Sequence, residues 1–130
     1  MEAKKVKKDL LYHMEKVVEE LKDSQLSKEF FKKAATHIRY VSKKLDMTQE
    51  QSVLMSLFID KSDDNCIYIS ELAEYMKCRT VRIIRYMPDI DELERRGLVR
   101  CSRSERRPSY RVPIEVINTF KNDESYIPRN

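Results

Sequence analysis

Apolar residues recur at intervals of three and four in two stretches near the start of the chain, over residues 4–22 and 27–45. This interval places apolar side chains on one face of an α-helix. The polar segment KDSQLS separates the stretches, and Ser27 at its end is a natural N-cap for the second. The pattern predicts two amphipathic helices, with apolar faces made of Val6, Leu10, Leu11, Met14, Val17, Val18 and Leu21, and of Phe30, Phe31, Ala34, Ile38, Val41 and Leu45.

Two arrangements can bury these apolar faces. The two helices can form a hairpin that packs on the rest of the chain, or they can pair with a second copy in a homodimer. Both arrangements remove the same side chains from water, so the pattern leaves the two alternatives open.

The middle of the chain carries signals for three further helices and a strand. Thr48 with Gln51 three residues later is a capping-box pattern ahead of the apolar run in QSVLMSLFID. CIYIS alternates as a short strand does, and Ser70 is an N-cap candidate for a helix over ELAEYMK. A third helix is expected to open near Arg79 or Thr80, after a tight turn at Cys78. The residues expected to face inward are Val53, Leu54, Leu57, Phe58, Leu72, Ala73 and Met76.

The only glycine in the chain, Gly97, predicts the end of that third helix, because glycine adopts the left-handed conformation of a helix C-terminus at low cost. LVRCSR and SYRVP then form a β-hairpin with a basic tip, and a last helix begins near Pro113. Pro88 is expected to kink or break the third helix. On a helix that starts near Arg79, the basic residues and Asp89 fall on one broad face, opposite an inward side of Val81, Ile83, Ile84 and Met87.

This order of elements is that of a winged helix-turn-helix. The predicted fold is therefore mainly α with a small antiparallel β wing, preceded by two amphipathic helices. The predicted segments are the amino-terminal helices over 1–46, the winged helix over 47–122 and a polar tail over 123–130.

The two basic residue types are segregated along the chain. Ten of the twelve arginines lie between Arg79 and Arg111, whereas twelve of the fourteen lysines precede residue 62. Eleven basic and five acidic residues occupy 77–111, so the net charge of +4 comes from this segment. Arginine presents a planar fork of donors that suits phosphates and guanine edges, which lysine does not. The segregation indicates a surface for a polyanion.

Duplex DNA is the polyanion that fits a winged helix. Recognition helices insert their early residues into the major groove, and wings follow phosphates or enter the minor groove. Arg79, Thr80 and Arg82 are the candidates for contact with base edges. The full set of predicted DNA-binding residues is Arg79, Thr80, Arg82, Arg85, Tyr86, Arg100, Arg103, Arg106 and Arg107.

Other chemistry has little support in the sequence. His13 and His37 stand apart from any serine, cysteine or acid at catalytic spacing, and Cys66, Cys78 and Cys101 form no CxxC pair or zinc pattern. We therefore expect no catalytic residues, no metal and no cofactor, with the cysteines as reduced structural thiols. No long apolar run or signal peptide is present, so a cytoplasmic protein without a membrane partner is expected.

The segment IDELERRGLVRCSRSERRPSYRVP resembles the third helix and wing of winged-helix DNA-binding domains such as the MarR-type regulators. The longer run ISELAEYMKCRTVRIIRYMPDIDELERRGLVRCSRSERRPSYRVPIEVI is similar to the region before the ATPase core in a group of bacterial AAA-type ATP-binding proteins. That resemblance implies a bacterial amino-terminal module whose partner is an ATPase core. The chain lacks a GxxxxGK[ST] loop of its own.

Two functions follow as hypotheses. The first is a non-catalytic DNA-binding module, and the second is a protein-interaction or oligomerisation module of the ATPase that does not bind DNA. Salt-dependent binding to duplex DNA distinguishes them.

Overall fold

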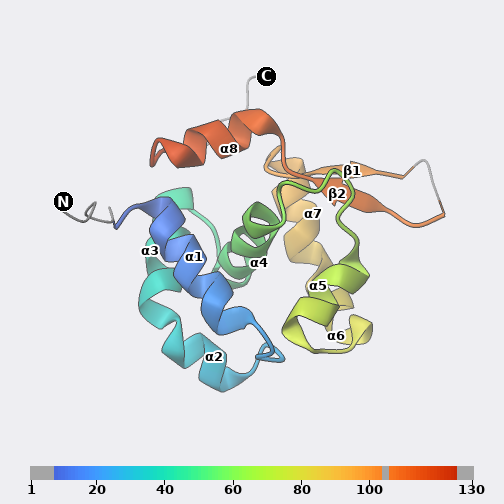
Figure 1. The fold of residues 1–130 in the computed structure, drawn as a ribbon, viewed down its shortest axis with the longest axis horizontal. Coiled ribbons are helices and arrows are strands. Elements are labelled where there is room, and N and C mark those ends of the chain that lie inside the picture. Colours follow the sequence, from blue (N-terminus) through green and yellow to red (C-terminus); the bar gives the residue numbers. More distant parts are fainter. Residues whose placement is uncertain (1–7, 104–105, 126–130) are drawn as a thin grey trace, which may run out of the picture.

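The computed structural model describes residues 8–103 and 106–125, and these form a mainly helical protein with one two-stranded antiparallel sheet (Figure 1). This confirms the predicted fold class. The elements are α1 Leu10–Leu21, α2 Lys28–Lys33, α3 Ala35–Leu45, α4 Gln49–Asp60, α5 Ile69–Met76, α6 Thr80–Ile84, α7 Met87–Arg95, β1 Arg100–Ser102, β2 Ser109–Arg111 and α8 Ile114–Lys121.

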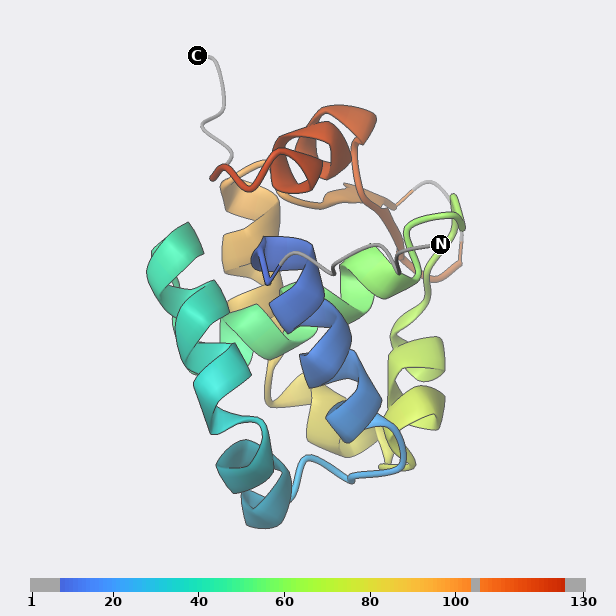
Figure 2. The same cartoon turned by 60° about the vertical axis from the view of Figure 1, so that its left-hand side comes forward.

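Helix α4 lies at the centre of the molecule, with α1 and α3 packed against it (Figure 2). Its residues 52–58 are all buried, so it lacks the polar face of a surface helix. Two serines are tolerated there because each hydroxyl finds a partner: Ser56 donates to the carbonyl of Ser52 at 2.7 Å, and Ser52 contacts Ser42 on α3 at 2.6 Å. The Thr48 and Gln51 capping box that begins α4 is confirmed.

The amino-terminal apolar faces are buried in a core that they share with the helices and strands that follow in the chain. From these faces, the core includes Leu10, Met14, Val17, Leu21, Phe30, Ala34, Ile38, Val41 and Leu45. Within the single chain, these helices therefore pack on the rest of the molecule, as the hairpin alternative has it, and the homodimer stays a prediction. Val6 and the start of the predicted first helix lie outside the described residues.

The predicted second helix is interrupted. The backbone at Ala34 leaves the helical range, with φ −92° and ψ 4°, and divides the stretch into α2 and α3. Ser27 caps α2 as expected, because its hydroxyl accepts a hydrogen bond from the backbone N–H of Phe30 at 3.3 Å.

Helices α5 and α6 follow each other across a short turn and pack together, and Pro88 accounts for the break after α6. Helix α6 ends at Ile84, and α7 begins at Met87 with Pro88 in its first turn, where a missing N–H costs nothing. The predicted Ser70 cap is wrong. Helix α5 begins at Ile69, two residues earlier than predicted, with Tyr68 at the N-cap position, so Ser70 lies inside the helix.

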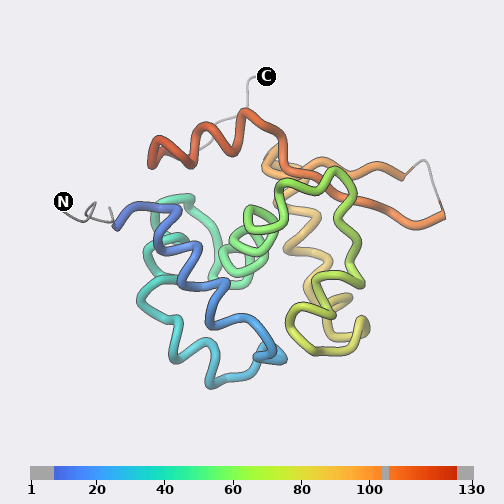
Figure 3. The backbone as a smooth tube through the Cα atoms, in the orientation of Figure 1, coloured from blue at the N-terminus to red at the C-terminus, as the bar shows by residue number. Residues whose placement is uncertain are grey.

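The hairpin projects beyond the helices, as the chain trace shows (Figure 3). Gly97, with φ 76°, ends α7 as predicted, and the N–H of Leu98 closes the cap on the carbonyl of Leu93 at 3.0 Å. Strands β1 and β2 pair with Cys101 opposite Tyr110. The strand expected over CIYIS is reduced to a single bridge between Ile67 and Tyr110. Helix α8 then covers this end of the core (Figure 1).

Candidate nucleic-acid interface

Four basic side chains line one concave site at the turn between α5 and α6. Lys77, Arg79, Arg82 and Arg85 surround a volume of about 540 Å³, and no acid is among the described residues that line it. All four side chains are exposed. We call this arrangement the α6 cationic site, which is completed by Gln25, Cys78 and Val81.

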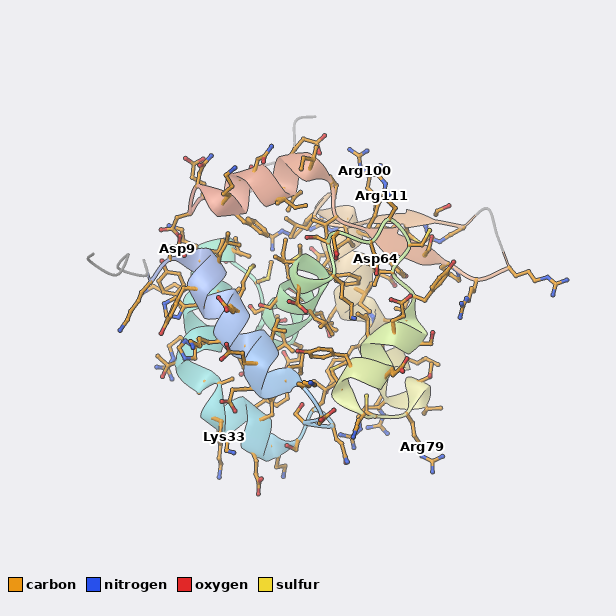
Figure 4. The ribbon with its side chains drawn as sticks, in the orientation of Figure 1. Asp9, Lys33, Asp64, Arg79, Arg100 and Arg111 are labelled. Carbon is orange, nitrogen blue, oxygen red and sulfur yellow. The ribbon has the colours of Figure 1, made fainter. Side chains whose placement is uncertain are left out.

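A left-handed turn brings these cations together. Lys77 has φ 53°, and the N–H groups of Lys77 and Cys78 close the end of α5 on the carbonyls of Glu74 and Ala73, at 3.2 and 3.0 Å. This is the cap that glycine usually completes, so a lysine here carries a conformational cost of about 1 kcal/mol. The turn points Arg79 away from the body of the molecule (Figure 4).

The loop between α1 and α2 supports this turn, and Figures 1 and 2 both show the two segments side by side. The N–H groups of Asp23 and Gln25 donate to the carbonyls of Tyr75 and Met76, at 3.1 and 2.8 Å. The guanidinium of Arg82 donates to the carbonyl of Gln25 at 2.8 Å. The amino-terminal segment therefore positions the α6 cationic site.

The backbone of that loop has an unusual conformation. Asp23, Gln25 and Leu26 all have φ between 53° and 59°, the left-handed region that residues with a side chain rarely occupy. Two of these residues are the ones whose N–H groups reach α5. Strain of this kind persists where surrounding contacts fix it, and it is concentrated at functional sites. Sequence reasoning missed Gln25 and Lys77 because neither carries a motif.

The expected inward side of the third helix is partly wrong. Ile83 is fully buried and Met87 is half-buried, but Val81 is 70 % exposed and Ile84 is 56 % exposed. The prediction placed Val81 and Ile83 on one side, but residues two positions apart on an α-helix lie on nearly opposite sides. Helix α6 has five residues and buries only Ile83.

The other predicted residues of this helix differ in their surroundings. Thr80 is the exposed first residue of α6. Tyr86, in contrast, lies at the break before α7 and packs against the core as a half-buried residue. Thr80 is therefore available to a ligand, whereas Tyr86 has a structural contact.

The wing arginines are divided between partners. Arg103 pairs with Glu94 on α7 through two hydrogen bonds, and this contact lowers the pKa of Glu94. The guanidinium of Arg107 lies 3.8 Å from the centre of the Tyr68 ring and 3.5 Å from the hydroxyl of Ser70. Arg106 is exposed next to residues 104–105, which lie outside the described part of the hairpin.

Arg100 lies apart from the α6 cationic site. It is opposite Arg111 across the two strands, and it approaches Glu115 on α8 at 4.0 Å. In Figure 4, Arg100 and Arg111 lie together at the top of the view, whereas Arg79 lies at the bottom. The predicted single basic surface is therefore two separate groups of arginines.

Two further arginines have structural contacts. Arg96 donates to the carbonyls of Leu45 and Asp46 at the end of α3, at 2.7 and 3.1 Å. Arg95 pairs with Glu92 one turn earlier on its own helix, and this pairing lowers the pKa of Glu92. Part of the arginine-rich segment thus stabilises the fold.

The two histidines are not isolated. His13 on α1 and His37 on α3 approach each other with 2.8 Å between their Nδ1 atoms, and Tyr40 stacks on the His13 ring. Burial, followed by the charge on His37, lowers the pKa of His13. Asp123, after α8, accepts a hydrogen bond from the N–H of Leu10 at 2.9 Å. This bond joins the residue after α8 to the start of α1, the helix that carries His13.

Neither these histidines nor the cysteines form a metal centre. The part of the chain that the structure describes contains no group of three histidine, cysteine or acidic residues suited to a metal ion. Cys66, Cys78 and Cys101 are free thiols, and burial raises the pKa of Cys78. Within residues 8–103 and 106–125, no helix has the length and apolarity needed to cross a membrane.

No family model, curated protein or solved structure matches this chain. The geometry of the α6 cationic site therefore carries the functional argument without support from relatives.

Proposed function

We propose that this protein is a non-catalytic winged-helix module that binds duplex DNA through the α6 cationic site. The observation that carries the proposal is the convergence of Lys77, Arg79, Arg82 and Arg85 at the opening of the second helix of a helix-turn-helix. In proteins of this architecture, that helix enters the major groove with its first residues toward the bases.

Charge favours a polyanion at this place. Four cations without an acid among the described lining residues repel one another, and phosphate groups relieve that repulsion. Arg79 and Arg85 have no intramolecular partner among the contacts of the described residues, so their donors are free for phosphates or base edges. Arg82 retains donors beyond the one that it gives to Gln25.

The wing supplies a second contact. The hairpin and α6 lie at the two ends of α5, on the same side of the molecule (Figure 1). Arg107, held over Tyr68 at the start of α5, and the neighbouring Arg106 would follow the phosphate backbone beyond the groove that α6 enters. Arg103 and Arg100 contribute less, because each already faces a carboxylate.

The predicted ATPase core and homodimer remain predictions. The amino-terminal helices contribute their apolar faces to the core, so an ATPase core or a second copy would have to contact other surfaces. The second hypothesis, a protein-interaction module that does not bind DNA, becomes the preferred one if the following experiment fails.

The experiment compares two double variants that lose the same charge. Arg79→Ala with Arg85→Ala removes two cations from the α6 cationic site, whereas Lys32→Ala with Lys33→Ala removes two exposed cations from α2. Fluorescence anisotropy with a mixed-sequence duplex in about 0.1 M salt measures affinity. Loss of a phosphate contact weakens binding by roughly tenfold at this salt concentration, so we expect a large loss for the first variant and less than threefold for the second. Equal losses would overturn the proposal.

A further inference from the structure

Helix α6 exposes two large apolar side chains in the middle of its cationic surroundings. Val81 is 70 % exposed and Ile84 is 56 % exposed, and within the described residues the only other exposed large apolar side chain is Ile114 on α8. Helix α6 has only five residues, and two of these three exposed side chains belong to it. A contact that removes them from water would be favourable.

The two side chains form a single contact surface. They are three positions apart on a helix, so they lie on the same face, about 4.5 Å apart along the helix axis. Base pairs in duplex DNA are stacked about 3.4 Å apart. The separation is between one and two base-pair steps, so the two side chains can reach the same or neighbouring base pairs.

The surroundings identify the occupant. Arg79, Arg82 and Arg85 alternate with the two apolar residues along the same short segment. Two side chains are far too small a patch for a stable protein interface, which buries at least about 1,000 Å² in total. The major groove combines flanking phosphates with one apolar group at base level, the C5-methyl of thymine.

We infer that Val81 and Ile84 contact thymine methyl groups in the major groove, so that the protein prefers A·T-containing sites. This inference rests on the proposed DNA binding and adds a specificity to it. The arginines beside the two residues contact phosphates or base edges, while the apolar pair distinguishes thymine from a base that lacks the methyl group.

Uracil substitution tests this directly, because uracil differs from thymine only by the missing methyl. The probes are an alternating A·T duplex and the same duplex with every thymine replaced by uracil, titrated at low salt. Burial of each methyl group favours binding by about fourfold, so we expect the thymine duplex to bind four- to fifteen-fold more tightly. The test variant is Val81→Ser with Ile84→Ser, and the control is Ile114→Ser, which removes the third exposed apolar side chain.

The inference predicts that the double variant binds both duplexes equally, while the Ile114 variant keeps the preference of the original chain. Equal binding of both duplexes by the original chain would overturn the inference and leave the proposed DNA binding intact. Persistence of the preference in the double variant would also overturn it, because the preference would then come from the duplex shape. Absence of binding to either duplex would overturn both proposals, as would a dimer that the double variant dissociates.

Discussion

Arg103 donates hydrogen bonds from both terminal nitrogens of its guanidinium to the two carboxylate oxygens of Glu94, at 3.0 and 2.9 Å. The pair joins the end of β1 to α7. A cation at the wing of the proposed DNA-binding surface is thus occupied by a carboxylate of the same chain.

Replacing Glu94 with glutamine should therefore strengthen DNA binding. The Glu94→Gln variant keeps the size of the side chain but frees the charge of Arg103 for a phosphate. One additional phosphate contact makes the dependence of log affinity on log salt steeper by about 0.9. Titrations at several salt concentrations measure this slope.

The matched control is Glu115→Gln. Glu115 faces Arg100, in the other group of arginines, so this variant should change the slope little. A Glu94→Gln slope equal to that of the original chain would show that Arg103 does not reach DNA.

Arg96 should matter for stability rather than for binding. Its guanidinium satisfies two carbonyls at the end of α3, and helix-end carbonyls are otherwise left to water. We expect Arg96→Ala to lower the free energy of unfolding by about 1 kcal/mol, measured by urea denaturation. Arg95→Ala removes an equal charge from an exposed pair within α7 and should cost less. Equal unfolding midpoints for the two variants would contradict this role.

The two left-handed cap positions provide an opposed pair of substitutions. Lys77 has φ 53° and Gly97 has φ 76°, and both end a helix with the same pair of backbone hydrogen bonds. Lys77→Gly should stabilise the fold by about 1 kcal/mol while weakening DNA binding, because it relieves the backbone and removes a cation. Gly97→Ala should destabilise the fold by about the same amount. Thermal and urea unfolding test both, and destabilisation by Lys77→Gly would refute the cap interpretation.

Stability should fall on mild acidification because of His13. Its pKa lies below the ordinary value of 6.5, through burial first and then through the charge on His37, with Lys8 acting in the same direction and Asp9 and Asp123 opposing. The unfolded chain therefore binds a proton more readily than the folded chain, and stability is lost as pH falls from the ordinary value toward the folded pKa. Urea midpoints between pH 5 and 8 should show this decline in the original chain and a weaker one in His13→Gln. An unchanged decline in that variant would assign it to other groups.

Local signals predicted the fold well. The Thr48 and Gln51 box, Ser27 and Gly97 act through neighbours within a few residues, and each determines a helix end that the structure confirms. The Ser70 prediction failed because α5 includes Ile69 and Ser70, two residues more at its start than predicted, and the N-cap residue Tyr68 makes no side-chain capping hydrogen bond that could mark the true start. The division at Ala34 likewise has no marker in the sequence.

The candidate site was harder to predict because its contacts join distant parts of the chain. Arg82 finds its partner at Gln25 and Arg96 finds its partners at Leu45 and Asp46, so their surroundings depend on the complete fold. The segregation of charge identified the arginine-rich segment. It could not distinguish arginines that contact other parts of the fold from arginines that face solvent. The exposure of Val81 follows from its position two residues before the buried Ile83, on nearly the opposite side of α6.

The salt dependence of duplex binding tests the central claim most directly. Contact of four or five cations with phosphates predicts a slope of roughly −4 for log affinity against log salt, and loss of Arg79 and Arg85 should make it shallower by about 2. Both slopes come from one anisotropy series on the original chain and the double variant. An absence of binding at low salt, or the same slope in both proteins, would contradict the assignment of the α6 cationic site to DNA.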